Sequence, residues 1–319
     1  MSAKLIHTLN DSVELNYSGR PLFKYVYNSQ APAVETKKPY FHPLYSLAGN
    51  VVTNFRPHDH AWHHGISMTM ANLSGQNFWG GASYIKGKEY VQLDNNGRIQ
   101  HTAWHELSSS GDKVAMKESL EWITFKGELW LAEERTLQVN EINTDKGYWS
   151  LDYGIRLKNV CKQELVFGSP TTEGRPMAGY GGLFWRGPRS FNGGKLLGAG
   201  GLEGQDIMGK RAEWVSYTGA HDGTLDKSTL LFIDQPGNLR YPTKWFVRND
   251  PFPVVSFAFS FDELYILRPG KEINNTYRIL IANGDWDREK IEFYLENNGS
   301  LKKGAPVKKE EVKGKKFKK

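Results

Sequence analysis

Apolar and polar residues alternate with a period of two along much of the chain. In residues 149–157 every odd position carries a bulky apolar side chain, and every even position is polar or glycine. Residues 255–261 repeat the pattern, with phenylalanine at three alternate positions. Because successive side chains of a β-strand point to opposite faces, the alternation predicts strands with one buried face. Shorter runs of this kind occupy residues 13–17, 22–27, 120–125, 128–139, 230–233 and 277–282.

Turns rich in glycine, asparagine and proline separate these runs, which indicates a sandwich or a barrel. One helix is predicted over residues 286–297, with Asp285 as its N-cap. We therefore predict an all-β fold, a large antiparallel β-sandwich with one C-terminal helix, formed by residues 1–297 as a single domain. The buried stripe of the helix is expected to consist of Ile291, Tyr294 and Leu295.

Charge is concentrated at the C-terminal end. The net charge of +6 includes nine lysines and two glutamates within residues 301–319, so the rest of the chain is close to neutral at −1. We predict a disordered Lys-rich tail over residues 298–319 and no nucleic-acid-binding face on the folded body. No apolar run reaches the ~20 residues that span a bilayer. The single Cys161 and an N-terminal segment without a signal core favour a cytoplasmic location.

Residues 174–209 interrupt the strand pattern, because twelve of these 36 positions are glycine. Such density permits close backbone approach and positive φ angles. A long irregular segment in a compact domain is typically a functional or a disordered loop. The functional interpretation is favoured by the aromatic and charged residues within it, Tyr180, Phe184, Trp185, Arg186 and Arg189.

The densest chemistry lies in residues 57–65, where His58, His60, His63 and His64 fall within seven positions. On a strand, His58 and His60 would face the same side, and the carboxylate of Asp59 could orient one imidazole. Imidazoles serve as acid–base catalysts, as substrate hydrogen-bonding groups or as metal ligands. A divalent metal would be held by the first three histidines; the remaining alternative is a hydrogen-bonded structural cluster.

Charged groups elsewhere could complete a site. Glu173 could act as a general base or a metal ligand, or it could pair with an arginine to hold its loop. Arg175 and Arg186 could bind a carboxylate, a phosphate or a polarised carbonyl oxygen. Trp185 either stacks on a sugar or fills the core.

Aromatic residues accompany cations in two further segments. Trp245 and Arg248 belong to residues 241–248, which suit either a polyol-binding rim or an ordinary strand. Trp79 lies in an aromatic turn that could line a cleft. The chain contains no phosphate-binding Walker loop, no Gly-x-Gly-x-x-Gly between a strand and a helix, and no Gly-x-Ser-x-Gly elbow, so nucleotide-driven chemistry and serine hydrolysis are unsupported.

Several of these motifs also occur together in a known family. Residues 39–44, 57–60, 63–65, 77–80, 181–186 and 242–245, with Gly49, Val52, Thr53 and Arg248, resemble soluble bacterial proteins labelled methane oxygenase PmoA-like. The resemblance covers residues 20–285. A true subunit of the particulate methane oxygenase spans membranes, and this chain has no spanning segment, so we do not take the label as its activity.

The resemblance implies a β-supersandwich similar to galactose-mutarotase-like proteins and a link to sugar catabolism. It also implies that His60 and His63 match the family's histidine pair and that Arg186 matches its loop arginine. Trp62 and His64 depart from the residues usual at their positions.

The leading hypothesis is an enzyme that acts on a sugar or modified (keto) sugar by isomerase, lyase or hydrolase chemistry. His60 or His63 would be the acid or base, Glu173 the carboxylate partner, and Arg186 would bind an oxyanion. The alternatives are a non-catalytic carbohydrate-binding sandwich and a metal-dependent oxygenase or isomerase. The expected partner is a small-molecule carbohydrate, and a homo-oligomer is compatible with exposed sheet edges. The candidate substrate-binding residues are His58, Asp59, His64, Trp79, Arg175, Trp185, Trp245 and Arg248.

Overall fold

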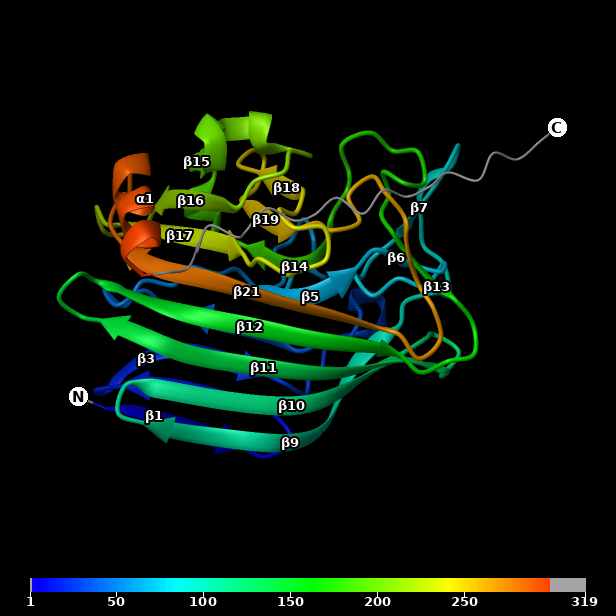
Figure 1. Ribbon diagram of the computed structural model, residues 1–319, viewed down its shortest axis with the longest axis horizontal. Coiled ribbons are helices and arrows are strands. Elements are labelled where there is room, and N and C mark those ends of the chain that lie inside the picture. Colours follow the sequence, from blue (N-terminus) through cyan, green and yellow to red (C-terminus); the bar gives the residue numbers. More distant parts are fainter. Residues whose placement is uncertain (1, 299–319) are drawn as a thin grey trace.

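Two antiparallel eight-stranded sheets form the body of the protein (Figure 1). The structure is a computed structural model, and it describes residues 2–298. The predicted class, an antiparallel β-sandwich with a C-terminal helix, is confirmed. In order across the first sheet, the strands are β1 (Ala3–Thr8), β2 (Ser12–Tyr17), β3 (Arg20–Val26), β4 (Tyr40–Leu44), β5 (Ile66–Met70), β14 (Gly181–Arg186), β19 (Val254–Phe257) and β18 (Trp245–Arg248).

The second sheet contains the longest strands, which run across the front of Figure 1. Its strands, in order, are β15 (Lys195–Gly198), β16 (Trp214–Ala220), β17 (Lys227–Asp234), β21 (Glu272–Asn283), β12 (Tyr148–Asn159), β11 (Leu129–Asn143), β10 (Lys113–Ile123) and β9 (Arg98–Ser110). Two small sheets lie beside the main ones and are formed by β20 (Tyr265–Leu267), β13 (Leu165–Gly168) and β6 (Asn72–Leu73), and by β7 (Ser83–Ile85) and β8 (Glu89–Val91). Short 3₁₀ helices are η1 (Ala33–Glu35), η2 (Arg189–Phe191), η3 (Ala199–Gly201) and η4 (Gly204–Ile207).

The alternation in residues 149–157 places one face of β12 in the core between the sheets. Its five odd-numbered side chains are at most 4% exposed and belong to one cluster with residues of the first sheet. Burying each such side chain contributes roughly 1.5–3 kcal/mol. The neighbouring strand continues the layer, since Tyr153 of β12 pairs directly with Tyr277 of β21.

The same alternation overstates the length of another strand. Phe259 and Phe261 are buried as the pattern requires, yet β19 ends at Phe257. A backbone hydrogen bond of 3.0 Å from Phe261 to Ala258 closes a turn there. The alternation in residues 255–261 therefore predicted correctly which side chains are buried, but only residues up to Phe257 form a strand.

The glycine-rich segment is not one irregular loop. It contributes β14, which lies between β5 and β19 within the first sheet, and β15 at the edge of the second. Gly182 makes this packing possible, because its φ is 79° and a Cβ would lie 2.1 Å from the carbonyl oxygen of Phe257. The predicted irregular backbone was wrong for these two strands, because glycine allows sheet backbones to approach closely.

The helix α1 spans Arg288–Asn297, and its N-cap is Asp287 rather than the predicted Asp285. Asp287 accepts a 2.9 Å hydrogen bond from the backbone of Lys290, whereas Asp285 forms ion pairs with Lys195 and Lys227. The predicted stripe is confirmed: Ile291, Tyr294 and Leu295 are buried against the face of the second sheet that points away from the first.

The predicted tail over residues 298–319 lies outside the described residues, except for Asn298. Within residues 2–298, no helix combines the length and the apolar character needed to cross a membrane.

Candidate active site

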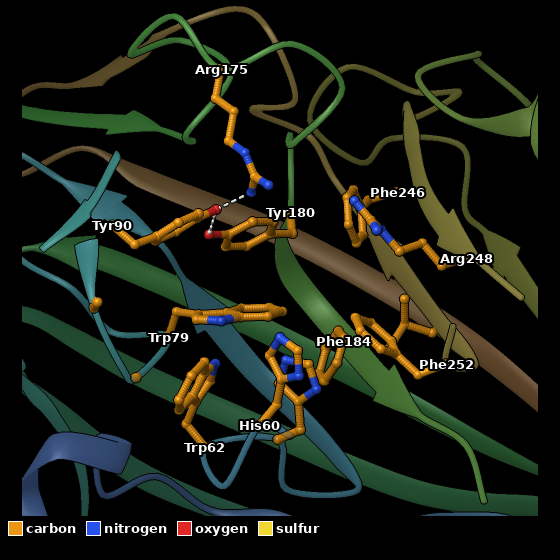
Figure 2. A pocket seen from close by; sticks show the side chains of 14 residues that line it. His60, Trp62, Trp79, Tyr90, Arg175, Tyr180, Phe184, Phe246, Arg248 and Phe252 are labelled. Atoms are coloured by element: carbon orange, nitrogen blue, oxygen red, sulfur yellow. Dashed lines mark hydrogen bonds between the residues drawn. The ribbon is translucent and has the colours of Figure 1, made fainter. Parts of the chain in front are cut away.

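A cavity of about 340 Å³ lies where the histidine-rich segment meets β8, β14 and β18. Its volume falls within the range of small-molecule sites. Figure 2 shows aromatic side chains on several of its sides, with His60 at one end and Arg175 at the other. The residues that line it are His60, Trp62, His63, Trp79, Gly80, Ala82, Tyr90, Arg175, Tyr180, Phe184, Phe246, Arg248, Phe252 and Val254.

The histidine-rich segment forms two consecutive turns between β4 and β5, not the strand face considered from the sequence. His60 N donates to the carbonyl of Pro57 at 3.0 Å, and His63 N donates to that of His60 at 2.9 Å. The second turn stacks the rings of His60 and His63, with centroids 4.6 Å apart and planes 14° apart. His58 is exposed and lines an adjoining cleft. The partner of His60 is therefore His63 and not His58.

Asp59 orients the ring of His60. Its Oδ2 lies 2.9 Å from His60 Nδ1 and 3.1 Å from Arg186 Nη2. Burial opposes ionisation of Asp59, but the hydrogen bond from His60 and the charge of Arg186 outweigh it and lower the pKa of this carboxyl. An ionised carboxylate only accepts hydrogen bonds, so His60 Nδ1 carries the proton and Nε2 holds a lone pair. Burial lowers the pKa of His60 despite Asp59, which leaves a neutral ring at neutral pH.

Arg186 sets the opposite tautomer on His63. Its Nη1 donates to His63 Nδ1 at 3.0 Å, and a guanidinium has no acceptor, so the proton of His63 lies on Nε2. Burial, with the nearby His60 and Arg186, lowers the pKa of His63 well below its usual value. The stacked pair thus combines one imidazole that can accept a proton with one that can donate a hydrogen bond.

Two tryptophans form the walls nearest the histidines. The ring of Trp79 lies 5.3 Å from that of His63, and its backbone turn is held by Asn77 Oδ1, which accepts from Trp79 N at 2.8 Å. Trp62 packs on His60 with centroids 5.2 Å apart. Gly81 makes room for this ring, since its φ is +67° and a Cβ would lie 2.8 Å from Trp62. Within residues 2–298 no group accepts a hydrogen bond from the buried Trp62 Nε1.

Lys38 is a buried support that sequence reasoning missed. Its Nζ donates to the carbonyl oxygens of Trp79 at 2.9 Å, Glu35 at 3.0 Å and Trp62 at 3.2 Å. Burial lowers the pKa of Lys38 to about 7, while the carbonyl dipoles favour the ammonium form. The lysine joins the two tryptophan segments, and nothing in its local sequence separates it from an ordinary surface lysine.

The opposite end and one side of the cavity carry two arginines that the sequence had indicated. Arg175 Nη1 donates to the hydroxyl of Tyr90, whose oxygen lies 2.8 Å from that of Tyr180 (Figure 2). Arg248 lies over Phe246, 5.6 Å from the ring centroid. Tyr90 and Tyr180 were not among the predicted binding residues: Tyr90 lies in a segment without other candidate chemistry, and Tyr180 was noted only as one of the aromatic residues of the glycine-rich segment.

Several predicted residues do not reach the cavity. Glu173 is exposed, accepts a 2.7 Å hydrogen bond from Asn72 and lines a separate hollow, so no carboxylate partner comes from this position. Trp185 and Trp245 are core residues whose Nε1 atoms donate to the backbone at Val52 and Ala212. These placements correct the predicted contacts of the two tryptophans with a substrate.

His64 is likewise a structural residue. Its Nε2 lies 3.1 Å from both Glu35 Oε2 and the carbonyl of Ala61, and its side chain is fully buried. Burial lowers the pKa of His64 to about 2. It fastens the histidine-rich segment to η1 and does not line the cavity.

The three histidines proposed to hold a divalent metal, His58, His60 and His63, do not point at one common position. Within the described part of the chain, no group of three or more His, Cys, Asp or Glu side chains could hold a metal ion. The rings of His60 and His63 are stacked face to face, while His58 lines the adjoining cleft. Metal dependence stays a prediction, for which elemental analysis of protein purified without chelating resin is the direct measurement.

Residues 12–296 match the model of a family of unknown function, DUF6807. The chain belongs to this family. No curated protein sequence matches it. The resemblance to the PmoA-like family stays a prediction.

Solved structures with a similar arrangement include three carbohydrate-active proteins. Heparan sulfate lyase HepC from Pedobacter heparinus shows 10% identity over 86% of this chain and 34% of that protein, with a TM-score of 0.39. The α-galactosidase from Lactobacillus brevis shows 10% identity over 92% of this chain and 42% of that protein, with a TM-score of 0.41. Galactose 1-epimerase from Lactobacillus acidophilus NCFM shows 7% identity over 89% of this chain and 99% of that protein, with a TM-score of 0.39. The chain spans about a third of the length of the lyase, and we take no activity or site residue from these similarities.

Proposed function

We propose that this protein is a carbohydrate-processing enzyme that moves a proton at a carbon next to the carbonyl carbon of a sugar or keto-sugar. The observation that carries the proposal is the stacked pair of His60 and His63, held in opposite tautomers by Asp59 and Arg186 beside an aromatic cavity. A base and a neutral hydrogen-bond donor side by side are what abstraction of a proton next to a carbonyl group requires.

In the proposed reaction His60 Nε2 takes the proton from carbon. The electron pair of the broken C–H bond moves to the carbonyl oxygen, which accepts a hydrogen bond from His63 Nε2. Asp59 stabilises the imidazolium formed on His60, as a carboxylate does behind a catalytic histidine. Return of the proton to the same or the adjacent carbon gives an isomerase, and departure of a group from the neighbouring carbon gives a lyase. General acid–base catalysis of this kind contributes roughly 10²–10⁴-fold.

The walls support a sugar-sized ligand. Trp62, Trp79 and Tyr180 present aromatic rings to the cavity, and such rings offer apolar faces against which the C–H face of a sugar packs. The same walls would serve a non-catalytic carbohydrate-binding sandwich. What favours an enzyme is the tautomer pair, because binding alone does not need a base fixed by a carboxylate.

Solvent exchange tests the proposal whatever the final product of the reaction is. The protein is incubated in D₂O with a panel of aldoses, ketoses and 3-keto-glycosides, and loss of the C–H signal next to the carbonyl is followed by proton NMR. At least one member of the panel should exchange, and His60→Gln should slow the exchange by about 100-fold or more.

The matched control is His58→Gln, which alters an exposed histidine two residues away that does not line the cavity. Its exchange rate should stay within twofold of the unaltered protein. Equal rates for the two variants would remove His60 from the mechanism. Saturable binding of a sugar without exchange would establish the binding sandwich in place of the enzyme.

A further inference from the structure

The cavity carries positive charge without a matching carboxylate. Of the 14 residues that line it, two are arginines and none is aspartate or glutamate. Arg186, just behind the histidines, is neutralised by its ion pair with Asp59, with Nη2 and Oδ2 3.1 Å apart. The cavity therefore favours an anionic ligand over a neutral or cationic one.

Arg248 is the better placed of the two lining arginines to bind an anion. Its guanidinium lies over the rings of Phe246 and Phe252, with centroid distances of 5.6 and 5.9 Å. Within the described residues it has no side-chain hydrogen bond and no ion pair, so all of its N–H donors are free. Arg175 already donates to Tyr90 and lies over that ring.

The surroundings of Arg248 strengthen this preference. The guanidinium lies over two phenylalanine rings, and Arg248 lines the cavity. A planar carboxylate matches the edge of a guanidinium with two parallel hydrogen bonds. An apolar neighbourhood also strengthens a charge-assisted contact relative to one in bulk water.

We propose that the substrate is a sugar acid whose carboxylate is bound by Arg248, with Arg175 as a second cation at the far end of the cavity. This inference rests on the proposed function, because it takes the reacting carbon to lie at His60. Figure 2 shows Arg248 on the side of Phe246 and Phe252, and the His60 ring lies next to Phe252, with centroids 4.8 Å apart. The carboxylate would then fix which carbon of the sugar faces the base.

Intrinsic fluorescence can report binding, since Trp62 and Trp79 line the cavity. D-glucuronate, D-galacturonate and D-mannuronate are titrated at low salt against the parent sugars and against the methyl esters of the acids. At least one acid should bind tenfold or more tightly than its ester and its parent sugar. This preference should shrink as the salt concentration rises, because salt screens the ionic contact.

Arg248→Gln should abolish the preference while leaving the weaker binding of the neutral sugar in place. The matched control is Arg268→Gln, which alters an exposed arginine that pairs with Glu164 at 3.4 Å; it should keep the preference. If Arg248 stabilised only charge that develops during the reaction, Arg248→Gln would slow exchange without changing the ratio of dissociation constants, and the inference would be wrong.

Equal binding of acids and esters, or no binding of any acid, would also overturn the sugar-acid inference. The solvent-exchange assay on neutral keto-sugars decides the proposed function separately. Exchange that depends on His60 with no preference for acids would leave the enzyme standing and remove only this assignment of its substrate.

Discussion

Two clusters of titratable side chains among the described residues invite comparison, because one lines a cavity and the other is buried without lining it. The first is the histidine cavity of His60, His63, Asp59 and Arg186. The second, which we call the buried network, lies between the sheets and consists of Tyr25 of β3, Glu118 of β10, and Glu133 and Arg135 of β11. Both contain an arginine paired with a carboxylate, and both contain groups with shifted pKa values, so neither feature separates them.

Hydrogen bonds pair most polar groups of the buried network with one another, although Arg135 Nη2 has no partner among the described residues. Arg135 Nε donates to Glu133 Oε1 at 2.7 Å, and its Nη1 donates to the hydroxyl of Tyr25 at 2.9 Å. That hydroxyl donates in turn to Glu118, which also bonds His101 at 2.6 Å. Burial opposes the charge of Arg135, but the adjacent Glu133 helps to raise its pKa.

The histidine cavity differs because its unpaired nitrogens belong to rings that line open space. His60 Nε2 and His63 Nε2 have no partner among the described residues, and both rings line open space. A perturbed pKa therefore indicates function only where the group is accessible to a ligand. In the buried network the same chemistry joins the two sheets.

The largest effect is expected from breaking the buried network. Arg135→Met leaves Glu133 and Glu118 buried without their cation, and removing one partner of a buried pair costs about 3–5 kcal/mol. Urea unfolding should show this loss in the free energy of unfolding. Sugar binding by the folded fraction should remain, because the cavity is built from other residues; a variant as stable as the unaltered protein would contradict the structural role.

The second largest effect is expected from removing the carboxylate beside His60. Asp59→Asn removes the carboxylate that fixes His60, and we expect solvent exchange to fall by about 10²-fold. Asp59 also raises the pKa of His60 against the larger opposing effect of burial. The acid limb of the rate profile should therefore move to lower pH in the variant. The measurement is the exchange rate from pH 4.5 to 8. A shift of the acid limb to higher pH would contradict the assignment of Asp59 as the carboxylate that raises the pKa of His60.

A smaller effect concerns stability in acid. The pKa of His64 is lowered to about 2 and that of His63 well below 6.5, so below pH 6.5 the unfolded chain binds protons that the folded protein does not. The free energy of unfolding should fall as the pH drops, by up to about 1.4 kcal/mol per pH unit for each histidine. His64→Gln should reduce this pH dependence by the contribution of one histidine, up to about 1.4 kcal/mol per pH unit. Urea unfolding at pH 7, 6 and 5 measures it, and an unchanged slope would argue against a buried neutral His64.

The smallest effect is expected at the surface. Arg156 and Glu272 form a two-point ion pair between β12 and β21, with N–O distances of 2.8 Å. Its N–O distances are close to the 2.7 Å between Arg135 and Glu133, but the arginine is exposed to solvent, where such pairs contribute little. Arg156→Gln should leave the unfolding midpoint unchanged. A loss comparable to that of Arg135→Met would show that burial is not what separates the two arginines.

The sequence was sufficient for the sandwich and for several, though not all, of the segments that meet at the cavity. Alternation identified the strands because burial of one face constrains every second residue. The clustering of His60 and His63 and the charge of Arg186 directed attention to the right segments, and the structure brings these three side chains together. Glu173, the predicted carboxylate partner, does not line the cavity, whereas Asp59, which the sequence offered as a carboxylate that could orient an imidazole, bonds His60.

Tertiary structure alone decided which polar residues have somewhere to act. Local sequence does not distinguish Lys38, enclosed by carbonyl oxygens, from a surface lysine, or Trp185 in the core from Trp79 at the cavity. Those differences arise from contacts between segments far apart in the chain. Periodicity records which face of a strand avoids water, whereas the tautomers of His60 and His63 depend on partners that folding brings within 3 Å.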